Sequence, residues 1–594
     1  MVEITALWMA MGLLAVMLLI SWQLRRSSLT TLDFYLANRQ VGTFVNACAI
    51  CGDYFSAASF LGVAAAVYAM GLDGVWFATG FAAGFVLVGL FLAAPLRRAG
   101  QFSIPDFLAN RYSSQVVRVT AVGVVLVVVL LYLIPQMTGV GLSWQVLVGH
   151  GAFGLSPYST GIIVASVAIV THSVLGGMRA TTWNQAFQFA FLFFTVLLLA
   201  GIAIHRGFSY PDAAKRLSQV PLVVPATLSP KELVADRPDG RTNLEAAASV
   251  MTPAGYEEVV AGLNRGEGSM EVLLPIPSEL DSEDIRFMEP GGGYNRLQQI
   301  ALVITLLLGT AGLPHIVNRY FTGTSGRAAR RSTVWVLGLA GVFYFVAVML
   351  GIAARAELPR LVGASTVNAD FVDGIARVPE HALLLLAREL GGEPLLGLVA
   401  AAALAAIFST VAGLLIAAAV SWGHDIYEQF INPQASERHR ILWGRLAVVC
   451  MAAISAMVGM SVAALDRRPN VAIMVTWAFA VAGSGFTPIF VLSVWWKRMT
   501  AAGAVAGMLT GTGLALLLVI FDVVARAADW LPAPPFGGFA SIVAAPAAAI
   551  VGITVSLRTR PSPQASAAWV RMHGTAQERR EAVLARLVPT GDER

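Results

Sequence analysis

A short run of polar residues interrupts a long apolar segment near the N-terminus. The sequence CGDYFSAASFLG, residues 51–62, places a glycine, an aspartate and two serines where an apolar helix would be expected. Asp53 and Tyr54 would be costly in lipid-like surroundings, so this segment must face protein or water. Gly52 lowers the cost of leaving a helix. We therefore predict that the helix is broken here.

A broken turn at this position would supply two kinds of ligand. Carbonyl oxygens freed from the helix are hard ligands that suit Na⁺. Ser56 and Ser59 would begin a new half-helix, whose free N–H groups and positive dipole end favour an anion. The alternative is a packing seam of small residues, such as Ala57, Ala58 and Gly62. The stretch alone favours neither reading.

A second interruption lies in the sequence LLLGTAGLPHIVNRYF, residues 306–321. Gly309, Thr310 and Gly312 precede Pro314, and proline is tolerated best at the first position of a helix. We predict a helix that stops near Gly309 and restarts at Pro314. Two discontinuous helices are typical of the midplane binding site of secondary transporters.

A third polar cluster lies in AAIFSTVAGLL, residues 405–415, where Ser409 and Thr410 are adjacent hydroxyls. Ala406 lies one turn earlier, so its carbonyl and the Ser409 side chain share a helix face. Such hydroxyls also bond back to the preceding turn, which is the structural alternative. The combination with the break at Gly52 favours a sodium site.

The composition indicates a polytopic membrane protein. Of the 594 residues, 57% are hydrophobic and 13% charged, and the mean hydropathy is +0.71, which excludes an ordinary soluble domain. The pI of about 9.2 comes from arginines in short segments between apolar runs, which indicates topology rather than nucleic-acid binding. Cys48 and Cys51 lie in an apolar run without a second pair or a histidine, so we interpret them as packing residues.

Apolar windows long enough to cross a membrane predict about thirteen spans. They lie near residues 4–22, 42–70, 74–95, 116–148, 159–176, 183–204, 297–318, 332–354, 394–421, 441–465, 470–495, 501–522 and 538–557. The arginine-containing loops follow the odd-numbered spans, so the positive-inside rule places them in the cytoplasm. The N-terminus would then lie outside and the C-terminus inside.

The spans divide the chain into a leading helix (1–24), a first repeat (25–204), an extracytoplasmic insertion (205–295), a second repeat (296–522), a trailing helix (523–557) and a cytoplasmic tail (558–594). Both predicted breaks fall in the first helix of a repeat, and the repeats enter the membrane from opposite sides. The acidic insertion is either a small external domain or a disordered segment. The tail sequence AQERREAVLARLV predicts an amphipathic helix.

Five motifs in order, GDYFSAASFLG, IPDFLANRY, LGGMRATTWNQ, LGTAGLPHIVNRYF and AAIFSTVAGLLIAAAVSWGHDIY, resemble the sodium:solute symporter family. The resemblance is strongest to its acetate permease (cation/acetate symporter) branch. It covers about residues 33–500 and leaves out the 205–295 insertion, which typical members lack at this length. It implies an all-α polytopic membrane protein with a LeuT-type core of two inverted five-helix repeats, in the cytoplasmic (inner) membrane of a bacterium. A related group has a small separate membrane subunit, which would be a possible partner here.

The resemblance also implies a sodium site, with Na⁺ as the coupling ion and no organic cofactor. Carried over by motif, its ligands are the carbonyls of Gly52, Phe55 and Ala406 and the hydroxyls of Ser409 and Thr410. Family members for sugars or amino acids often carry an aspartate after the tryptophan of the third motif. Here Asn184 and Gln185 follow Trp183, again as in the acetate branch.

The expected solute is a small monocarboxylate, bound by the half-helix N-termini at the two breaks. His315 could add positive charge, or it could simply bond a neighbouring helix. Gln136 follows Pro135 and could bind solute or satisfy a carbonyl freed by that proline. The candidate solute-binding residues are Asp53, Tyr54, Ser56, Ser59, Gln136, Thr310, Pro314 and His315.

Other functions remain open at this point. The solute could be an amino acid such as proline, or a sugar, and the chain could be a transporter-like sensor that acts with a partner. An enzyme is disfavoured because the spans contain no H-E-x-x-H or comparable nucleophile and base pattern. A passive channel would carry filter loops or charged pore rings.

Overall fold

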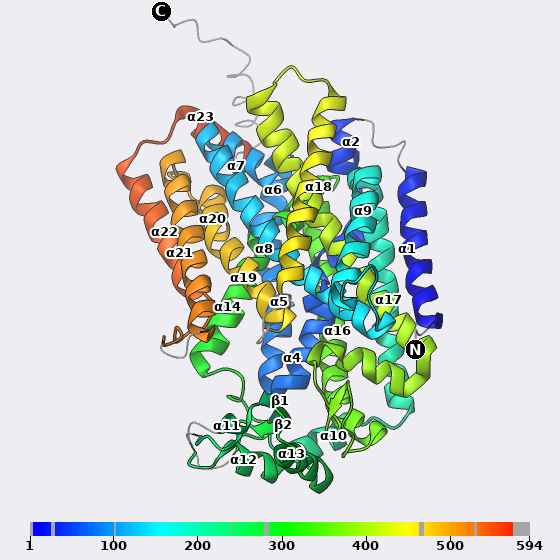
Figure 1. Cartoon of the computed structure of the whole chain (residues 1–594). Helices are drawn as coiled ribbons and strands as arrows, with labels where there is room; N and C mark the ends of the chain where they lie inside the picture. Colours follow the sequence, from blue (N-terminus) through cyan, green and yellow to red (C-terminus); the bar gives the residue numbers. More distant parts are fainter. Residues whose placement is uncertain are drawn as a thin grey trace, which may run out of the picture.

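A bundle of long helices stands on a small α/β domain, as Figure 1 shows for the computed structural model of the chain. The structure describes residues 4–24, 30–99, 102–237, 239–277, 284–462, 469–527 and 531–573. Among these residues, ten helices are long and apolar enough to cross a membrane, or eleven if one bent pair counts as a single span, and a shorter apolar helix covers Leu7–Gln23. The count of thirteen spans stays a prediction.

The helices of the first part of the chain include the predicted apolar spans and two short helices, Thr31–Leu36 and Ile104–Tyr112, that the hydropathy pattern does not predict. They are α1 (Ile4–Leu24), α2 (Thr31–Leu36), α3 (Thr43–Tyr54), α4 (Val63–Met70), α5 (Val75–Leu87), α6 (Ala93–Ala99), α7 (Ile104–Tyr112), α8 (Gln115–Val148) and α9 (Pro157–His205). A π-helical turn, Ala58–Gly62, leads into α4, and a second π-helical turn, Val88–Leu92, joins α5 to α6.

A second series of helices follows the insertion. Its helices are α14 (Arg296–Gly312), α15 (Pro314–Thr322), α16 (Gly326–Val362), α17 (Ala382–Val420), α18 (Glu437–Val462), α19 (Val471–Gly485), α20 (Thr487–Trp495), α21 (Ala501–Ala527), α22 (Ser541–Arg558) and α23 (Pro563–His573). A π-helical segment, Ser421–Ile431, continues α17. The amphipathic helix predicted at residues 576–588 lies outside the described residues.

Two long helices contain glycine kinks. Gly177 has φ 57° and divides α9 between the predicted spans 159–176 and 183–204. Gly392 has φ 65° inside α17, just before the predicted span 394–421 begins. Residues other than glycine rarely adopt this left-handed backbone conformation. Each helix therefore changes direction where the sequence supplies a glycine.

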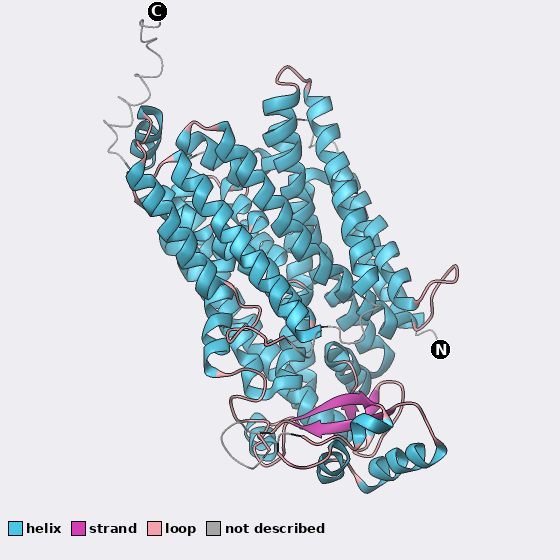
Figure 2. Ribbon diagram, turned by 60° about the vertical axis from the view of Figure 1, so that its left-hand side comes forward, coloured by secondary structure: helices cyan, strands magenta, loops and turns pink. Residues whose placement is uncertain are grey.

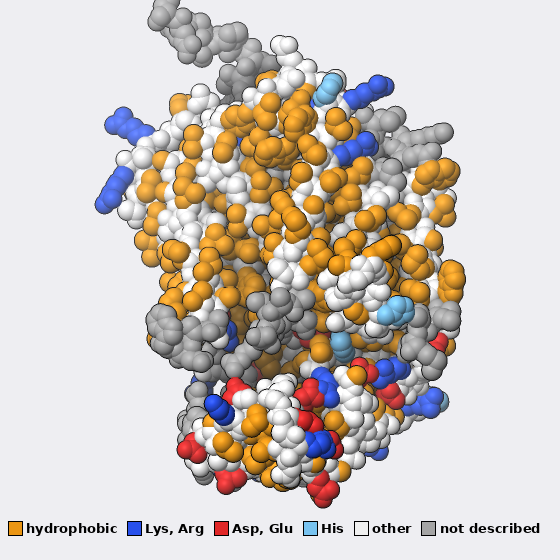
Figure 3. All heavy atoms as spheres, in the orientation of Figure 1, with side chains coloured by type: hydrophobic (Ala, Val, Ile, Leu, Met, Phe, Trp, Pro, Cys, Tyr) orange, Lys and Arg blue, Asp and Glu red, His pale blue; other side chains and the backbone are white. Residues whose placement is uncertain are grey.

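Hydrophobic side chains cover the middle of the bundle, and charged side chains gather at its two ends (Figure 3). At the end opposite the α/β domain, arginines tie neighbouring loops together. Arg97 donates to the carbonyl of Gly323 at 2.5 Å, and Arg498 donates to the carbonyl of Leu557 at 3.3 Å. We call this end, which carries Arg97, Arg98, Arg118 and Arg498, the arginine-rich end. An apolar belt between two polar ends is the expected surface of a membrane protein.

The insertion is a folded domain in its described residues, so the disordered alternative is wrong for them. Strands β1 (Val223–Leu228) and β2 (Met270–Pro275) pair antiparallel, and Figure 2 shows this sheet at one end of the helix bundle. The short helices beside them are α10 (Tyr210–Leu217), α11 (Pro230–Leu233), α12 (Asn243–Val250) and α13 (Pro253–Arg265).

The insertion is docked on α16 and on the hairpin that follows it by polar contacts. Thr252 Oγ1 donates to Asp373 Oδ1 at 2.6 Å, next to a hairpin of β3 (Phe371–Val372) and β4 (Ile375–Ala376). Arg216 pairs with Glu357 of α16 at 2.9 Å. These contacts hold the domain against the end of α16 and the hairpin that follows it.

A buried carboxylate joins the turn between α4 and α5 to the end of the insertion and the start of α14. Asp73 lies in the turn between α4 and α5 and is fully buried. It accepts hydrogen bonds from the backbone N–H groups of Gly291, Gly293 and Tyr294 and from Gln299 Nε2, at 2.7–3.1 Å. Such a cradle of N–H groups satisfies a buried carboxylate. The Gly-rich exit of the insertion is thereby fixed where α14 begins.

Candidate functional site

The first helix break lies three residues after the predicted position. Gly52 stays inside α3, which ends at Tyr54, and Phe55 leaves the helical conformation with ψ 84°. Gly52 is required for a different reason, because a Cβ there would lie 2.5 Å from the carbonyl oxygen of Gln185. Glycine at this position therefore allows α3 and α9 to approach closely, and the break itself comes from Phe55 and Ser56.

The break frees the carbonyl oxygen of Gly52, one of the predicted sodium ligands. The N–H of Ser56 bonds the carbonyl of Tyr54 at 2.9 Å, so the Gly52 carbonyl lacks its usual partner four residues on. Ser409 Oγ donates to the Gly52 oxygen at 2.6 Å and to the Ala406 oxygen at 2.8 Å. Thr410 Oγ1 donates to the same Ala406 oxygen at 3.1 Å.

Four of the five predicted sodium ligands thus form one connected cluster of oxygen atoms, at the meeting of α3 and α17. We call Gly52, Ala406, Ser409 and Thr410 the oxygen cluster. The fifth residue, Phe55, caps the C-terminal end of α3, and its ring stacks on Phe343 with centroids 4.1 Å apart. Carbonyl and hydroxyl oxygens are the ligands that hard cations prefer.

At the second break, the helix restarts at Pro314, as the sequence predicts. The break itself begins after Gly312 rather than near Gly309. Helix α14 continues through Gly309 to Gly312, Leu313 is extended, and α15 starts at Pro314. The two helices are bent by 41°. A Cβ at Gly309 would collide with Phe479 of α19, so this glycine allows close packing of α14 on α19 rather than ending the helix.

A hydrogen bond connects the two broken helices. The Tyr54 hydroxyl donates to the carbonyl of Phe81 at 2.9 Å and lies 2.6 Å from Thr310 Oγ1. Aromatic rings enclose this contact: the Tyr54 ring lies 4.6 Å from Phe85 and 6.2 Å from Phe479. Tyr54 and Thr310 are therefore brought together, and their hydroxyls are already paired within the protein.

Polar side chains from α8 and α15 gather beside the first break. Ala57 donates its N–H to Gln136 Oε1 at 3.1 Å, at the start of the new half-helix. Tyr132 lies one turn before Gln136, and its hydroxyl is 3.5 Å from Ser56 Oγ. The His315 ring packs edge-on against Tyr132, with centroids 5.3 Å apart. We call Ser56, Tyr132, Gln136 and His315 the donor cluster.

Three nitrogens of the donor cluster have no hydrogen-bond partner among the described residues. They are Gln136 Nε2 and both ring nitrogens of His315, although the two side chains are 0% and 2% exposed. A buried polar group without a partner costs about 1–3 kcal/mol. Native proteins rarely tolerate this except where a ligand or an ordered water supplies the partner. The donor cluster is thus suited to a small polar ligand.

Ser59 and Pro314, two further residues predicted to bind solute, do not belong to the donor cluster. Ser59 lies in the new half-helix, but its hydroxyl donates to the Tyr54 carbonyl at 3.1 Å and lies 3.0 Å from the Tyr344 hydroxyl. Pro314 is the first residue of α15 and is buried without a polar role. Both shape the site rather than offer free polar atoms.

Asp53 is paired inside the protein. Its Oδ2 accepts from Arg319 Nε at 2.5 Å, and its Oδ1 accepts from Gln185 Nε2.

Sequence reasoning noted Gln185 without giving it a role, and it missed Arg319 altogether. The signal was present, because an arginine in an apolar window next to a predicted break is a candidate functional residue by default. Tyr132 was missed because an isolated tyrosine in a long apolar helix has no such signal.

One group of metal-ligating side chains lies away from the breaks, at the arginine-rich end. Asp106, His424 and Asp425 offer atoms within 4.8 Å of one another. Arg118 Nη1 lies 3.0 Å from Asp106 Oδ1 and 2.9 Å from Asp425 Oδ1. The guanidinium already supplies the positive charge between the two carboxylates, so we interpret the group as an ion-pair network.

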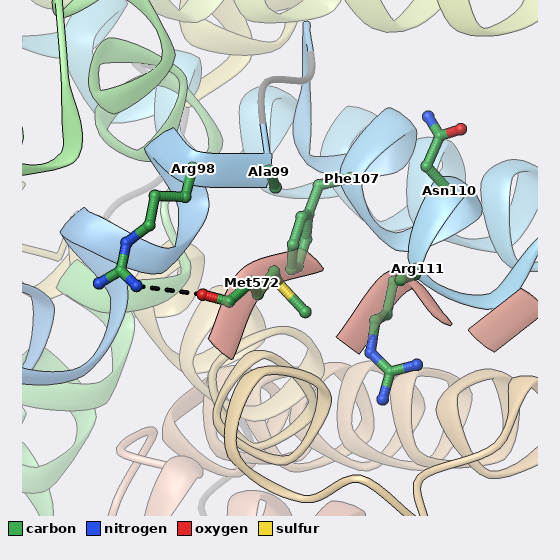
Figure 4. Close-up of a pocket in the computed structure, with 7 residues that line it drawn as sticks. Arg98, Ala99, Phe107, Asn110, Arg111 and Met572 are labelled. Atoms are coloured by element: carbon green, nitrogen blue, oxygen red, sulfur yellow. Dashed lines mark hydrogen bonds between the residues drawn. The ribbon is translucent and has the colours of Figure 1, made fainter. Parts of the chain in front are cut away.

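Two pockets lie outside the breaks. A pocket of about 70 Å³ lies between α6, α7 and α23, and Figure 4 shows the guanidinium groups of Arg98 and Arg111 on opposite sides of it, so they do not converge on one ligand. A larger, mostly apolar cavity of about 440 Å³ lies between the insertion and α16, lined by Phe287 and Met349 among others. Neither pocket is lined by a residue of the oxygen or donor cluster.

In this bundle of apolar spans, two broken helices meet beside clusters of polar atoms. This arrangement is typical of secondary transporters. The chain belongs to the sodium:solute symporter family, whose family model matches residues 34–511. It is 33% identical over 503 residues to the monocarboxylic acid transporter of Corynebacterium glutamicum, covering 84% of this chain and 80% of that protein. It is 31% identical over 519 residues to the uncharacterized symporter YwcA of Bacillus subtilis, covering 87% and 86%.

The fold is also that of a solved sodium symporter. The structure of a Na⁺-coupled sialic acid symporter, in a substrate-bound outward-open state, matches with a TM-score of 0.62 and covers 94% of this chain and 99% of that one, at 15% identity. The fold is thus LeuT-type, with two inverted five-helix repeats, as the resemblance implied. The family and this structural neighbour are transporters rather than enzymes.

Proposed function

We propose that this protein is a symporter that couples the uptake of a small monocarboxylate to Na⁺ by alternating access. The observation that carries the proposal is the unpartnered Gln136 Nε2 and His315 nitrogens beside the N-terminus of the half-helix that starts at Ala57. N–H donors and a positive dipole end favour a carboxylate there. The similarity to a protein named monocarboxylic acid transporter supports this solute class over a sugar or an amino acid.

In this proposal the oxygen cluster holds the sodium ion. The Ser409 hydroxyl already lies within 2.6–2.8 Å of the Gly52 and Ala406 carbonyl oxygens, so these atoms are within reach of one small cation. Thr410 Oγ1 and the Phe55 carbonyl would complete the ligand set. The donor cluster lies on the other side of the same break, so ion and solute would stabilise one conformation of this segment.

We further propose that the arginine-rich end faces the cytoplasm of a bacterial cell, which follows from the positive-inside rule. The insertion and the N-terminus would then lie outside the cytoplasmic membrane. The division into repeats of residues 25–204 and 296–522 is part of this proposal, and the small membrane subunit stays a prediction.

Reconstituted protein tests the proposal directly. We expect proteoliposomes to accumulate labelled acetate, propionate, lactate or pyruvate when a Na⁺ gradient points inward, because the ion supplies the driving force. Proline and glucose serve as alternative solutes, and vesicles with equal Na⁺ on both sides serve as the control. Accumulation of proline or glucose instead would refute the solute class. Equal uptake with and without the gradient would refute sodium coupling.

Replacing Ser409 with alanine should raise the Na⁺ concentration for half-maximal uptake. The change removes the hydroxyl that bridges Gly52 and Ala406 and should cost about 1–3 kcal/mol of sodium binding, a factor of about 5 to 150 in affinity. The matched control is Ser143→Ala, since Ser143 is buried and its hydroxyl donates to Gly139 of its own helix at 2.8 Å. Unchanged sodium dependence in Ser409→Ala would argue against the oxygen cluster.

Replacing Gln136 with glutamate separates solute classes. The substitution keeps an oxygen that accepts from the Ala57 N–H, but it replaces the unpartnered Nε2 with a second oxygen. For a carboxylate solute we expect apparent affinity to fall by at least about tenfold, the equivalent of about 1.4 kcal/mol, because like charges would face each other. Equilibrium Na⁺ binding without solute should stay near the wild-type value. Unchanged affinity would indicate that the carboxylate does not bind here.

A further inference from the structure

A buried ion pair joins two half-helices just beyond the oxygen cluster. Asp53 of α3 and Arg319 of α15 are 0% and 1% exposed, and Arg319 Nε lies 2.5 Å from Asp53 Oδ2. Arg319 Nη1 also donates to Thr182 Oγ1 of α9 at 2.7 Å. Nearer the arginine-rich end, Asn46 Nδ2 donates to the Arg319 carbonyl at 3.3 Å. These contacts hold α3 and α15 together on the arginine-rich side of the breaks.

Gln185 of α9 completes this pair with both ends of its amide. Its Nε2 donates to Asp53 Oδ1, and its Oε1 accepts from Arg319 Nη2. Only this orientation of the amide gives an acceptor to the guanidinium and a donor to the carboxylate. Both carboxylate oxygens of Asp53 are therefore used inside the protein, which argues against Asp53 as a direct ligand of the solute.

The same amide also contacts the oxygen cluster. Gln185 Nε2 donates to the Ser409 carbonyl at 2.8 Å, while the Ser409 hydroxyl donates to the Gly52 carbonyl at 2.6 Å. Gly52 in turn packs against the Gln185 backbone, where a Cβ would collide. A displacement of Ser409 or Gly52 would therefore move Gln185 and loosen the Asp53–Arg319 pair.

We propose that Gln185 is a positioning residue that couples the sodium site to an inner closure formed by Asp53 and Arg319. The inference rests on the proposed function and adds how the ion is sensed. With Na⁺ on the oxygen cluster, Ser409 and Gly52 hold Gln185, and Gln185 holds the ion pair closed. When the ion leaves, the amide is released, and the pair can separate as water enters from the arginine-rich end.

The native cysteines of α3 report this closure. Cys48 and Cys51 are buried on the same half-helix as Asp53, whereas Cys450 is exposed. In a Cys450→Ser background, the rate of labelling by a membrane-impermeant thiol reagent applied at the arginine-rich face therefore measures the opening of α3. We expect Na⁺ to slow labelling of this background protein by about fivefold or more, the lower end of usual coupling between sites.

The test compares Gln185→Met with Gln188→Met, the same change one turn further along α9. Gln188 contacts Met17 of α1 and not the ion pair. We expect Gln185→Met to bind ²²Na⁺ but to lose protection of the cysteines, while Gln188→Met keeps both. Protection retained in Gln185→Met overturns the coupling role and leaves the proposed function intact. Absence of sodium binding in the background protein overturns the proposed function and this inference together.

A double variant keeps the test decisive if Gln185→Met does not fold. Asp53→Asn with Arg319→Gln removes both charges together, so neither is left buried without its partner. We expect its cysteines to be labelled rapidly with or without Na⁺, because the closure is gone while the oxygen cluster remains. Normal protection by Na⁺ in the double variant would show that the ion pair is not the closure and would overturn the proposal.

Discussion

Arg319→Gln is expected to lower the free energy of unfolding by about 3–5 kcal/mol, because it leaves Asp53 as a buried, uncompensated charge. Asp53 is fully buried, and Arg319 is its only cationic partner among the described contacts. The attraction between the two charges is strong in these low-dielectric surroundings. The midpoint of thermal unfolding in detergent, followed by circular dichroism, measures the loss.

Two variants make this result specific. Asp53→Asn combined with Arg319→Gln should recover most of the lost stability, because no charge then remains unpaired. The exposed Arg330 provides the matched surface control, and Arg330→Gln should change stability by no more than about 0.5 kcal/mol. If Arg319→Gln unfolds at the wild-type midpoint, another group must compensate the charge of Asp53, and the ion pair does not stabilise the fold.

Gly52→Leu is expected to abolish sodium binding and, through coupling, solute binding. A Cβ at this position would lie 2.5 Å from the Gln185 carbonyl oxygen and 3.0 Å from its carbon. The backbone of a packed helix cannot move away without shifting its neighbours. Helices α3 and α9 must therefore separate, and the Gly52 carbonyl then leaves Ser409. Equilibrium binding of ²²Na⁺ and of labelled solute to purified protein measures both losses.

A glycine in open space provides the control for this substitution. Gly338 lies within α16, and nothing lies within 4 Å of a Cβ built there. Gly338→Leu should leave sodium and solute binding unchanged, because the added side chain meets no neighbour. Normal sodium binding in Gly52→Leu would mean that the close approach of α3 and α9 is not needed for sodium binding and that the oxygen cluster is not the sodium site.

The sequence by itself determined the features that depend on neighbouring residues. Apolar runs long enough to span a membrane predicted the helices, since burying backbone polar groups in lipid requires them. Pro314 marked the restart of α15, because proline is accommodated at the start of a helix. The adjacent hydroxyls of Ser409 and Thr410 pointed to Ala406, since one helical turn brings them onto one face.

Only the tertiary structure decided the positions of the breaks and the role of Asp53. Gly52 and Gly309 were taken as helix breakers, but both remain helical, because other helices press against them and exclude a side chain. Arg319 pairs with Asp53 across 266 residues of sequence. A local pattern shows that a buried charge needs a partner, but which partner it receives depends on how distant helices pack.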